Sequence, residues 1–495
     1  MFEVAELGHK VEKSEYQARV PELRTKLLMA QQALRNADFP VLILVSGADG
    51  AGKGSTVNLI NEWLDPRYMR TYAFGVPTEE ERARPPYWRY WRDLPAKGTT
   101  GLYVGSWYSE PIAQRVRKEL KEAEFDTALN RINAFEKTLV DDGALIIKFW
   151  LHLSQKEQKK RLKRLEKDPN TRWRISKQDW KQLEVYDRFV GIAEHALRET
   201  STGEAPWTIV EGSSPHYRNL TVGQHILDRL RERLAKTGDR EPSVPHLQPI
   251  SSPTPGTQPV SVLKSVDLTQ RIEKREYKNK LKSLQSHLSK LSRKALAKKT
   301  SSMIVLEGWD AGGKGGLIRR MTPALDARAY QVIPVAAPTD EEAAHHYLWR
   351  FWRHIPRGGH VTIYDRSWYG RVLVERIEDF TPREDWMRAY TEICNFEEQL
   401  SRHGIVVVKF WVHIDQDEQL ARFKAREETP HKQHKITDED YRNREKWEAY
   451  EHAVNDMVER TSTEYAPWYL IAGNDKPFAR IQALQIFCDR LEEAL

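Results

Sequence analysis

Cysteine is scarce in this sequence of 495 residues, which contains only Cys394 and Cys488. Small secreted domains depend on many disulfides, so this class of protein is excluded and we expect both thiols to be reduced. The N-terminal residues have neither a basic start nor an apolar core, so a secretory signal is also missing. We therefore expect a cytoplasmic protein.

Long apolar runs are missing as well. No stretch approaches the ~18 apolar residues that a membrane-spanning helix requires, so we expect no membrane association. Apolar residues make up 40% and charged residues 30% of the chain, which is an ordinary balance for a soluble protein. The excess of 78 basic over 71 acidic residues favours a polyanionic partner, such as nucleic acid, a nucleotide or inorganic phosphate.

The most informative feature that is present is an internal repeat. Residues 47–54 (GADGAGKG) return as residues 308–315 (GWDAGGKG), at an offset of 261 residues. The tripeptides Ser-Trp-Tyr, Lys-Phe-Trp and Ala-Pro-Trp recur at the same offset. Solenoid units are only ~20 to 50 residues long, so this spacing indicates duplication of a whole domain.

A segment rich in proline, serine, threonine and glutamine separates the two copies. Such a composition is typical of a semi-extended spacer. We therefore predict a first domain over residues 1–236, a linker over 237–262 and a second domain over 263–495.

Each copy alternates short apolar runs with charged stretches. Residues 41–45 and 303–306 are predicted strands that enter a glycine-rich turn, and residues 404–408 begin another strand. Residues 273–291 and 415–428 contain neither glycine nor proline and are predicted helices. The fold class is therefore α/β, with a mostly parallel sheet flanked by helices in each of two tandem copies.

A strand, then Gly-x-x-x-x-Gly-Lys, then a helix is the pattern of a phosphate-binding P-loop. In the second copy Gly308, Gly313, Lys314 and Gly315 would surround a phosphate with backbone N–H groups and one ammonium group. The alternative is a glycine turn beside a surface lysine, which the strand context and the second copy disfavour. Glycine replaces the usual Ser or Thr after the lysine in both copies, so a metal ion there needs another ligand.

Two aspartates of the second copy are the candidate metal ligands. Asp310 lies inside the loop itself, and Asp365 ends the apolar run 361–365 (VTIYD) in the manner of a Walker B strand. Carboxylates and substrate phosphates are the ligands that Mg²⁺ prefers. The sequence therefore predicts that Asp310 and Asp365 hold Mg²⁺.

Basic side chains follow that strand. Arg366 comes directly after Asp365, and its forked guanidinium suits a transferred phosphoryl group. Arg371 and Glu375 are four residues apart, so on a helix they would share a face that points toward the phosphates. An exposed helix salt bridge is the alternative for that pair.

The first copy lacks these groups. At the offset of 261 residues, Asp365, Arg366, Arg371 and Glu375 are replaced by Val104, Gly105, Glu110 and Gln114. The neighbouring packing residues are retained, which is what loss of chemistry with retention of fold would leave. We hypothesise that the first copy is catalytically silent, with a structural or substrate-holding role and an emptier cleft at Val104 and Gly105.

The loop 308–316 (GWDAGGKGG) and the stretch 364–376 (YDRSWYGRVLVER) resemble the polyphosphate kinase 2 family, and the resemblance covers each copy nearly end to end. The tandem layout is similar to the subgroup that uses polyphosphate to phosphorylate AMP to ADP. The resemblance implies a thymidylate-kinase-like fold, a lid and dependence on Mg²⁺. It implies catalytic, metal or phosphate roles for Asp310, Lys314, Asp365, Arg366, Arg371 and Glu375.

The resemblance also places basic lid residues near Arg422, Arg426, Lys432 and Lys435. This copy has His434 where the family often has a tryptophan, whereas the first copy has Trp173. Arg353 and Arg350 would extend a basic surface for a donor charged along its whole length, although each could instead be a solvated surface charge. Among the aromatics, Trp349, Trp352 or Trp368 could stack on adenine or could simply fill the core.

Other functions stay open at this point. An ATP-dependent nucleotide kinase uses the same loop and metal, and a polyphosphate-dependent kinase could instead act on nucleoside diphosphates. A polyanion-binding protein with vestigial loops is a further alternative. No helix-turn-helix, RNP or zinc pattern is present, so we expect no nucleic-acid partner. The sequence leaves the acceptor nucleotide, the preferred direction and the oligomeric state open.

Overall fold

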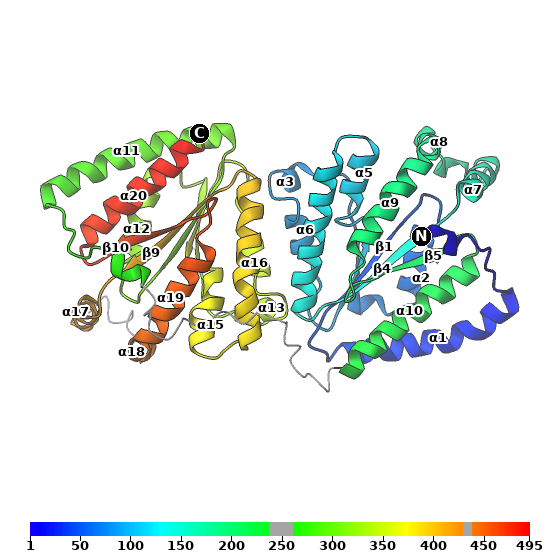
Figure 1. Cartoon of the computed structure of the whole chain (residues 1–495), viewed down its shortest axis with the longest axis horizontal. Coiled ribbons are helices and arrows are strands. Elements are labelled where there is room, and N and C mark those ends of the chain that lie inside the picture. Colours follow the sequence, from blue (N-terminus) through cyan, green and yellow to red (C-terminus); the bar gives the residue numbers. More distant parts are fainter. Residues whose placement is uncertain (237–260, 429–437) are drawn as a thin grey trace. The chain divides into compact units, whose positions relative to one another are not determined.

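A computed structural model describes residues 1–236, 261–428 and 438–495. The chain forms two compact units, and each unit is built around a five-stranded sheet with helices on both faces (Figure 1). All strand pairs are parallel, so the predicted α/β class and its duplication are confirmed. Within the described ranges, no helix combines the length and apolar character needed to cross a bilayer.

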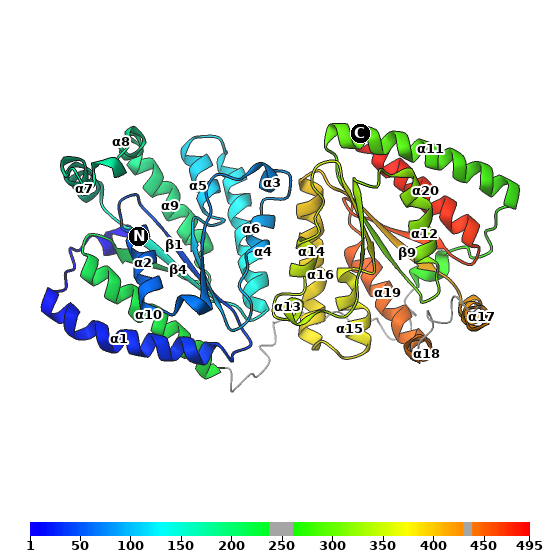
Figure 2. The same cartoon turned by 180° about the vertical axis from the view of Figure 1, so that it is seen from behind.

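The sheet of the first unit has the strand order β2-β3-β1-β4-β5. Its strands are β1 (Val41–Gly47), β2 (Met69–Ala73), β3 (Thr100–Val104), β4 (Leu145–His152) and β5 (Trp207–Glu211). The helices of the first half are α1 (Lys13–Leu34), α2 (Lys53–Trp63), α3 (Glu79–Arg82), α4 (Trp88–Arg92), α5 (Ser109–Val116), α6 (Glu122–Asp141), α7 (Gln155–Lys167), α8 (Lys177–Glu184), α9 (Tyr186–Thr200) and α10 (Pro215–Lys236). Helices α1 and α10 pack together on one face, and α6 and α9 pack on the other (Figures 1 and 2).

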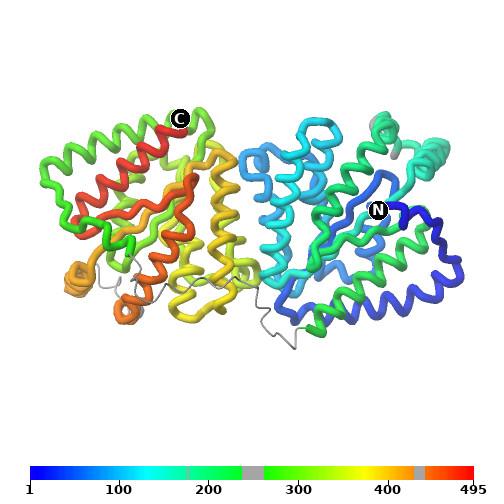
Figure 3. Tube along the Cα trace, in the orientation of Figure 1, coloured from blue at the N-terminus to red at the C-terminus, as the bar shows by residue number. Residues whose placement is uncertain are grey.

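The sheet of the second unit has the order β10-β9-β6-β8-β7, which is the same topology read from the other edge. Its strands are β6 (Ser302–Gly308), β7 (Tyr330–Pro334), β8 (Val361–Asp365), β9 (Val406–His413) and β10 (Trp468–Ala472). The helices of the second half are α11 (Lys274–Lys298), α12 (Lys314–Met321), α13 (Asp340–Ala343), α14 (Trp349–Trp352), α15 (Val374–Ile377), α16 (Arg383–Arg402), α17 (Gln416–Glu427), α18 (Asp438–Glu445), α19 (Trp447–Thr461) and α20 (Lys476–Glu493). The tube view shows α11 and α20, the first and last long helices of this half, side by side (Figure 3).

Short 3₁₀ turns complete the chain. They are η1 (Phe2–Ala5), η2 (Pro66–Tyr68), η3 (Arg172–Arg174), η4 (Val262–Ser265), η5 (Thr322–Ala324) and η6 (Trp368–Val372). Val262, the last residue of the predicted linker, begins η4, and its N–H donates to Asn455 Oδ1 at 3.0 Å. The rest of that segment, residues 237–260, lies outside the described residues.

The predicted strands and helices are present, with shifted ends. The run 303–306 lies within β6, the run 361–365 coincides with β8, and the helix predicted over 273–291 extends to Lys298. The strand predicted from residue 404 begins at Val406, because Gly404 has a φ of 82° and ends the preceding turn. Apolar periodicity therefore locates these elements but not their ends.

Each central strand ends where only glycine fits. A Cβ at Gly308 would lie 2.6 Å from the carbonyl oxygen of Val412, and one at Gly47 would lie 2.1 Å from that of Leu151. Both glycines also have φ values in the left-handed region, 149° and 137°. The chain can therefore leave the sheet at this point and turn into the phosphate-binding loop.

A buried ion pair joins strand β9 of the second unit to helix α16. The Lys409 ammonium on β9 donates to Glu397 Oε2 at 2.7 Å, to the Tyr369 hydroxyl at 2.8 Å and to the Thr461 carbonyl at 2.7 Å. Glu397 also accepts from Trp368 Nε1 at 3.1 Å, and the side chains of the pair are 0% exposed. Burial lowers the pKa of Lys409 and raises that of Glu397, and each shift is opposed by the partner's charge.

The first unit repeats this network. Lys148 donates to Glu136 at 2.7 Å, to Tyr108 at 3.0 Å and to the Thr200 carbonyl at 2.7 Å. The repeated Ser-Trp-Tyr and Lys-Phe-Trp tripeptides are therefore retained in both copies because they supply the members of a buried polar network.

Replacing Lys409 with methionine should strongly destabilise the second unit, because Glu397 is left buried without a counter-charge. We expect Lys409→Met to lower the free energy of unfolding by about 3–5 kcal/mol, measured by urea titration. The double variant Lys409→Met/Glu397→Leu should be less destabilised than the single variant, and the exposed Lys424→Met should change stability by less than about 0.5 kcal/mol. Equal losses from Lys409→Met and Lys424→Met would contradict a stabilising pair.

Candidate active site

The loop of the second copy connects β6 to α12. Gly313 precedes the helix with a left-handed φ of 118°, which turns the first free N–H groups of α12 toward the loop. The Lys314 ammonium donates to the carbonyl oxygens of Gly308 at 2.7 Å and Trp309 at 3.4 Å. The loop is therefore closed around its own lysine.

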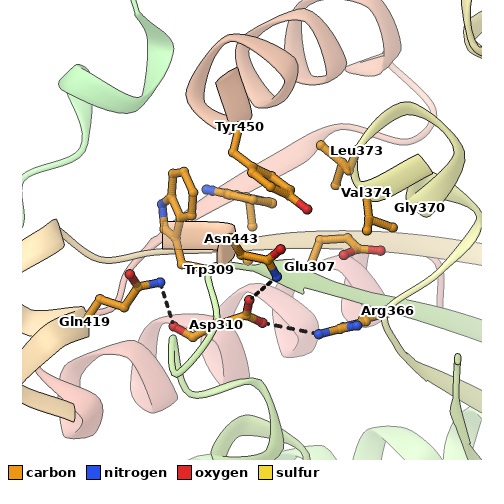
Figure 4. Close-up of a pocket in the computed structure, with 12 residues that line it drawn as sticks. Glu307, Trp309, Asp310, Arg366, Gly370, Leu373, Val374, Gln419, Asn443 and Tyr450 are labelled. Atoms are coloured by element: carbon orange, nitrogen blue, oxygen red, sulfur yellow. Dashed lines mark hydrogen bonds and ion pairs between the residues drawn. The ribbon is translucent and has the colours of Figure 1, made fainter. Parts of the chain in front are cut away.

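Asp310 lies at the centre of the pocket beside this loop (Figure 4). Its carboxylate accepts from Arg366 Nη2 at 3.2 Å and from Asn443 Nδ2 at 2.9 Å. Gln419 Nε2 donates to its backbone carbonyl at 3.2 Å. Two side-chain donors thus fix the position of the carboxylate, and a third donor holds the backbone of the same residue.

Arg366 has an uncommon backbone conformation. Its φ is 66°, whereas the corresponding residue of the first copy, Gly105, has a φ of 70° and no side chain to strain. A non-glycine residue in this region costs of order 1–3 kcal/mol, so a guanidinium is kept here against a backbone penalty. In the first copy a Cβ at Gly105 would lie 2.4 Å from the carbonyl oxygen of Phe74.

A second carboxylate, Glu307, is buried behind Asp310. The register pairs Leu306 with Asp365, so Glu307 on β6 and Asp365 on β8 end neighbouring strands. The Ser367 hydroxyl donates to Glu307 Oε1 at 2.8 Å. Burial raises the pKa of Glu307, while the charges of Lys314 and Arg366 oppose that rise.

Trp309 lines the pocket and is one member of a stacked tryptophan pair. Trp309 of the loop lies on Trp447 of α19 with ring centroids 3.7 Å apart and an interplanar angle of 7°. Its Nε1 donates to Nδ1 of His413 at 3.0 Å. Burial lowers the pKa of His413 to about 4, so the imidazole is neutral near pH 7 and this nitrogen can accept. The stack and the hydrogen bond hold the loop against the sheet.

Arg422 does not fit the role of a free lid cation. Its guanidinium is buried, and its five N–H groups are all engaged. The acceptors are the carboxylate of Glu418 and the carbonyl oxygens of Ala311, Gly312, Gly473 and Asn474. Arg422 therefore ties the loop to the end of β10 and has no donor left for a phosphate.

Arg371 and Glu375 do not share one helix as predicted. Arg371 lies in η6 and Glu375 in α15, because Leu373 interrupts the helix with a ψ of −98°. They form an ion pair at 3.1 Å, and the Thr381 hydroxyl bonds to both. The guanidinium of Arg371 also lies 4.4 Å from the ring centre of Tyr347. The structure thus brings them to each other and not into the lining of the pocket around Asp310.

The remaining predicted residues are spread more widely. Arg353 is exposed, with its guanidinium 4.6 Å from the ring centre of Trp349. Arg426 is in the last turn of α17, and Lys432 and Lys435 lie outside the described residues. The three tryptophans considered for stacking on adenine, Trp349, Trp352 and Trp368, are all buried in the core, which excludes that role in this conformation.

Sequence reasoning missed Glu307 and Asn443. The signal for Glu307 was available, because the first copy has Ser46 at the corresponding position and the difference falls beside the loop. Asn443 had no such signal, since Gln182 of the first copy is also an amide and only the fold brings α18 to the loop.

The loop of the first copy is paired differently. Lys53 donates to Asp49 at 3.0 Å as well as to the carbonyl oxygens of Gly47 and Ala48. With Gly105 in place of the arginine, Asp49 neutralises the lysine of its own loop. In the second copy Arg366 and Asn443 hold the equivalent aspartate instead.

The carboxylates of Asp310 and Asp365 are candidate ligands for a metal ion. The part of the chain that the structure describes holds no group of three or more His, Cys, Asp or Glu side chains arranged to bind a metal. Asp365 is half-buried at the end of β8, and its carboxylate accepts no hydrogen bond from the described residues. Two carboxylates at one edge of the sheet fit a hard cation that takes its other ligands from substrate phosphates and water.

The comparisons with known proteins agree with this geometry. The family model described as Polyphosphate kinase 2 matches residues 10–238 and again residues 271–495. A protein named polyphosphate:AMP phosphotransferase from Pseudomonas aeruginosa is 53% identical over 495 residues, covering 100% of this chain and 99% of its own. One of the same name from Acinetobacter johnsonii is 38% identical, covering 95% and 96%.

A solved structure is similar over the same length. The crystal structure of a protein assigned to polyphosphate kinase 2 from Pseudomonas aeruginosa superimposes with a TM-score of 0.89 at 50% identity, covering 100% of this chain and 99% of that one. The resemblance inferred from the loop and from residues 364–376 is therefore confirmed. With both copies matched from end to end, the chain belongs to the polyphosphate kinase 2 family.

Proposed function

We propose that this chain transfers the terminal phosphoryl group of inorganic polyphosphate to AMP, giving ADP, at the loop of the second copy. The observation that carries the proposal is the position of Asp310, a residue of the phosphate loop, between Arg366 and Asn443 in a pocket. The first copy has Gly105 in place of Arg366. AMP as the acceptor is supported by relatives of full length that are named for this reaction.

Phosphoryl transfer requires alignment and charge neutralisation rather than a protein nucleophile. The amides at the start of α12 and the Lys314 ammonium would hold phosphate oxygens of the donor. The guanidinium of Arg366, 48% exposed and directed at the pocket, would neutralise charge on the transferred group. A phosphate oxygen of AMP then attacks the terminal phosphorus of polyphosphate, and the shortened chain leaves with the bridging oxygen.

Magnesium is the cofactor that we propose for this site. Asp310 and Asp365 would hold it, and when bound it would supply positive charge to the donor and acceptor phosphates. Glycine at position 315 offers no hydroxyl ligand, so the carboxylates and substrate oxygens carry the coordination. Asn443 and Arg366 would keep Asp310 oriented toward it.

We also propose that the two copies have different roles. The first domain, residues 1–236, would be catalytically silent, and the second, residues 263–495, would carry out the reaction. The self-paired Lys53 and Asp49 of the first loop support this asymmetry.

The reaction can be tested with AMP, polyphosphate and Mg²⁺ in the absence of ATP. We expect ADP formation by the full chain, and a loss of roughly 10²–10³-fold in kcat/KM for Lys314→Ala, because one ammonium that stabilises the transferred charge is removed. Lys53→Ala is the matched control and should leave kcat/KM within about twofold.

Two outcomes would overturn parts of this proposal. Formation of ADP only when ATP is supplied would reject polyphosphate as the donor. Equal losses from Lys314→Ala and Lys53→Ala would reject a silent first copy. Parallel assays with ADP and GMP as acceptors would decide the choice of nucleotide.

Arg366→Gly should separate stability from activity. The variant relieves the left-handed strain of Arg366 but gains unfolded-state entropy, so the free energy of unfolding should change by less than about 1 kcal/mol. Loss of the guanidinium should lower kcat/KM by roughly 10²–10³-fold. Urea titration and the ADP assay measure the two effects, with Arg366→Lys as the variant that keeps the charge. Full activity in Arg366→Gly would argue against a role in transfer.

Glu307 predicts a specific dependence of stability on pH. Because its folded-state pKa is raised, its contribution to stability is fully present below the ordinary carboxyl pKa of about 4.3 and is lost as pH rises through the raised value. The stability of the unliganded wild type relative to Glu307→Gln should therefore fall with rising pH over this window. Urea titrations at several pH values measure it, and Glu448→Gln, on the surface of α19, controls for loss of a charge. If the difference in free energy of unfolding between the wild type and Glu307→Gln did not change with pH, a raised pKa of Glu307 would be contradicted.

A further inference from the structure

We infer that the silent first copy contains a binding site for condensed phosphate chains, located at the carboxyl ends of β4 and β5. The site is distinct from the loop at residues 47–54, and assigning it a substrate-holding role rests on the proposed function. It would bind the donor polyphosphate without reacting with it.

The first observation is a cavity of about 600 Å³ at this edge of the sheet. Its walls are the N-terminal segment from Ala5 to Glu12, the ends of β4 and β5, and one side of α7. The N-terminal segment is held in place by Phe2, whose ring stacks on His152 at 4.6 Å. All three walls of the cavity thus belong to one unit.

The second observation is the charge of α7. Its thirteen residues include seven basic side chains and two acidic ones, whereas the equivalent helix of the second copy, α17, has three of each. Four of the basic side chains, Lys156, Lys160, Arg161 and Arg164, line the cavity together with Lys10. The copy that has lost the catalytic groups therefore has the more basic helix.

The third observation is the state of Arg161. It corresponds to Arg422, whose guanidinium is fully engaged, yet it makes no hydrogen bond or ion pair with any described residue, and its Nε is buried without a partner. Burial lowers its pKa, and the charge of Arg164 adds to that shift. A half-buried guanidinium without an acceptor is costly, so its geometry suits an anionic ligand.

Sequence differences between the copies explain why Arg161 lacks the acceptors that Arg422 has. Arg218 on α10 donates to the carbonyl of Ala51 at 3.4 Å, and in the second copy Arg422 donates to the corresponding carbonyl of Gly312. Ser154 and Ser213 replace the Asp415 and Asn474 of the second copy. In the second copy that aspartate and asparagine are joined by a hydrogen bond of 2.6 Å, which bridges the ends of β9 and β10. The first copy therefore has two serine hydroxyls beside an open cavity, where the second copy has a hydrogen bond between aspartate and asparagine.

The lining also carries four carboxylates beside its five basic side chains, and three of the four carboxylates already have partners of their own. Glu6 bonds to His152 at 2.7 Å, and Glu211 accepts from the backbone and ring of His9. Glu157 is 3.6 Å from Lys160, and Glu12 precedes α1. Lys10, Lys156, Arg161 and Arg164 have no ion pair within the described chain.

The shape of the site favours a condensed phosphate over nucleic acid. Apart from the ring of His152, the cavity lining contains no aromatic side chain on which a base could stack. Cationic groups spaced along one helix suit a ligand with a charge on every unit and no other feature to recognise. A long chain held here stays tethered to the protein, which raises its effective concentration at the second copy.

The test measures binding of labelled long-chain polyphosphate to the full chain carrying Lys314→Ala, without AMP, by fluorescence anisotropy. Adding Arg161→Gln, or adding Lys156→Gln, Lys160→Gln and Arg164→Gln together, should weaken binding roughly tenfold. The matched control is Lys159→Gln, Lys163→Gln and Lys167→Gln, which removes the same charge from the same helix but away from the cavity, and should change affinity by less than about twofold.

In the enzyme with an intact Lys314, the cavity variants should raise KM for long chains and affect tripolyphosphate less. Equal weakening by the cavity and control variants would overturn the site and leave only general attraction by a basic helix. Equal affinity for a single-stranded DNA of matched charge would overturn condensed phosphate as the ligand. Absence of ADP formation by the wild type, with cavity-dependent binding retained, would reject the proposed reaction and leave the binding site intact.

Discussion

The buried lysine–glutamate pair is the constraint on which both units depend. It joins the middle of a central strand to a covering helix and to the Tyr of the Ser-Trp-Tyr turn, at 0% exposure of Lys409 and Glu397. An ion pair taken out of water stabilises little by itself, but losing one partner leaves a buried charge. Neither copy can therefore abandon the network, which explains why the turn after the Walker B strand keeps its position even where Asp365 and Arg366 have been lost.

The site of the second unit is built on this fixed turn. Because the turn holds the chain in place, Arg366 can adopt a left-handed backbone and reach Asp310 from the neighbouring strand. From the other side, Asn443 and the stacked Trp309 fix the loop. Rigid elements thus position a small number of charged groups, as expected for catalysis that depends on alignment rather than on a reactive side chain.

Much of this could be predicted from sequence, because the relevant signals are local. The phosphate loop and the strand ending in Asp365 are short segments whose chemistry depends on adjacent residues, and the repeat reveals both copies. Arg422 could not be assigned, since four of its five acceptors lie more than 50 positions away in the sequence. An arginine of a lid and an arginine buried against the loop cannot be told apart from the sequence alone. Arg371 and Glu375 were expected on one helix because spacing alone does not reveal the break at Leu373.

The glycine at position 105 has a lasting consequence for the first copy. In the first copy a Cβ at this position would lie 2.4 Å from the carbonyl oxygen of Phe74, so any residue other than glycine would collide with a main-chain oxygen. Replacing Gly105 with arginine alone would therefore not reproduce the arrangement of the second copy, because the neighbouring chain would have to move too. The first copy thus differs from the second in its main chain as well as in its side chains, and a single substitution can change its charged surface more readily than it can rebuild the pairing of Arg366 with Asp310.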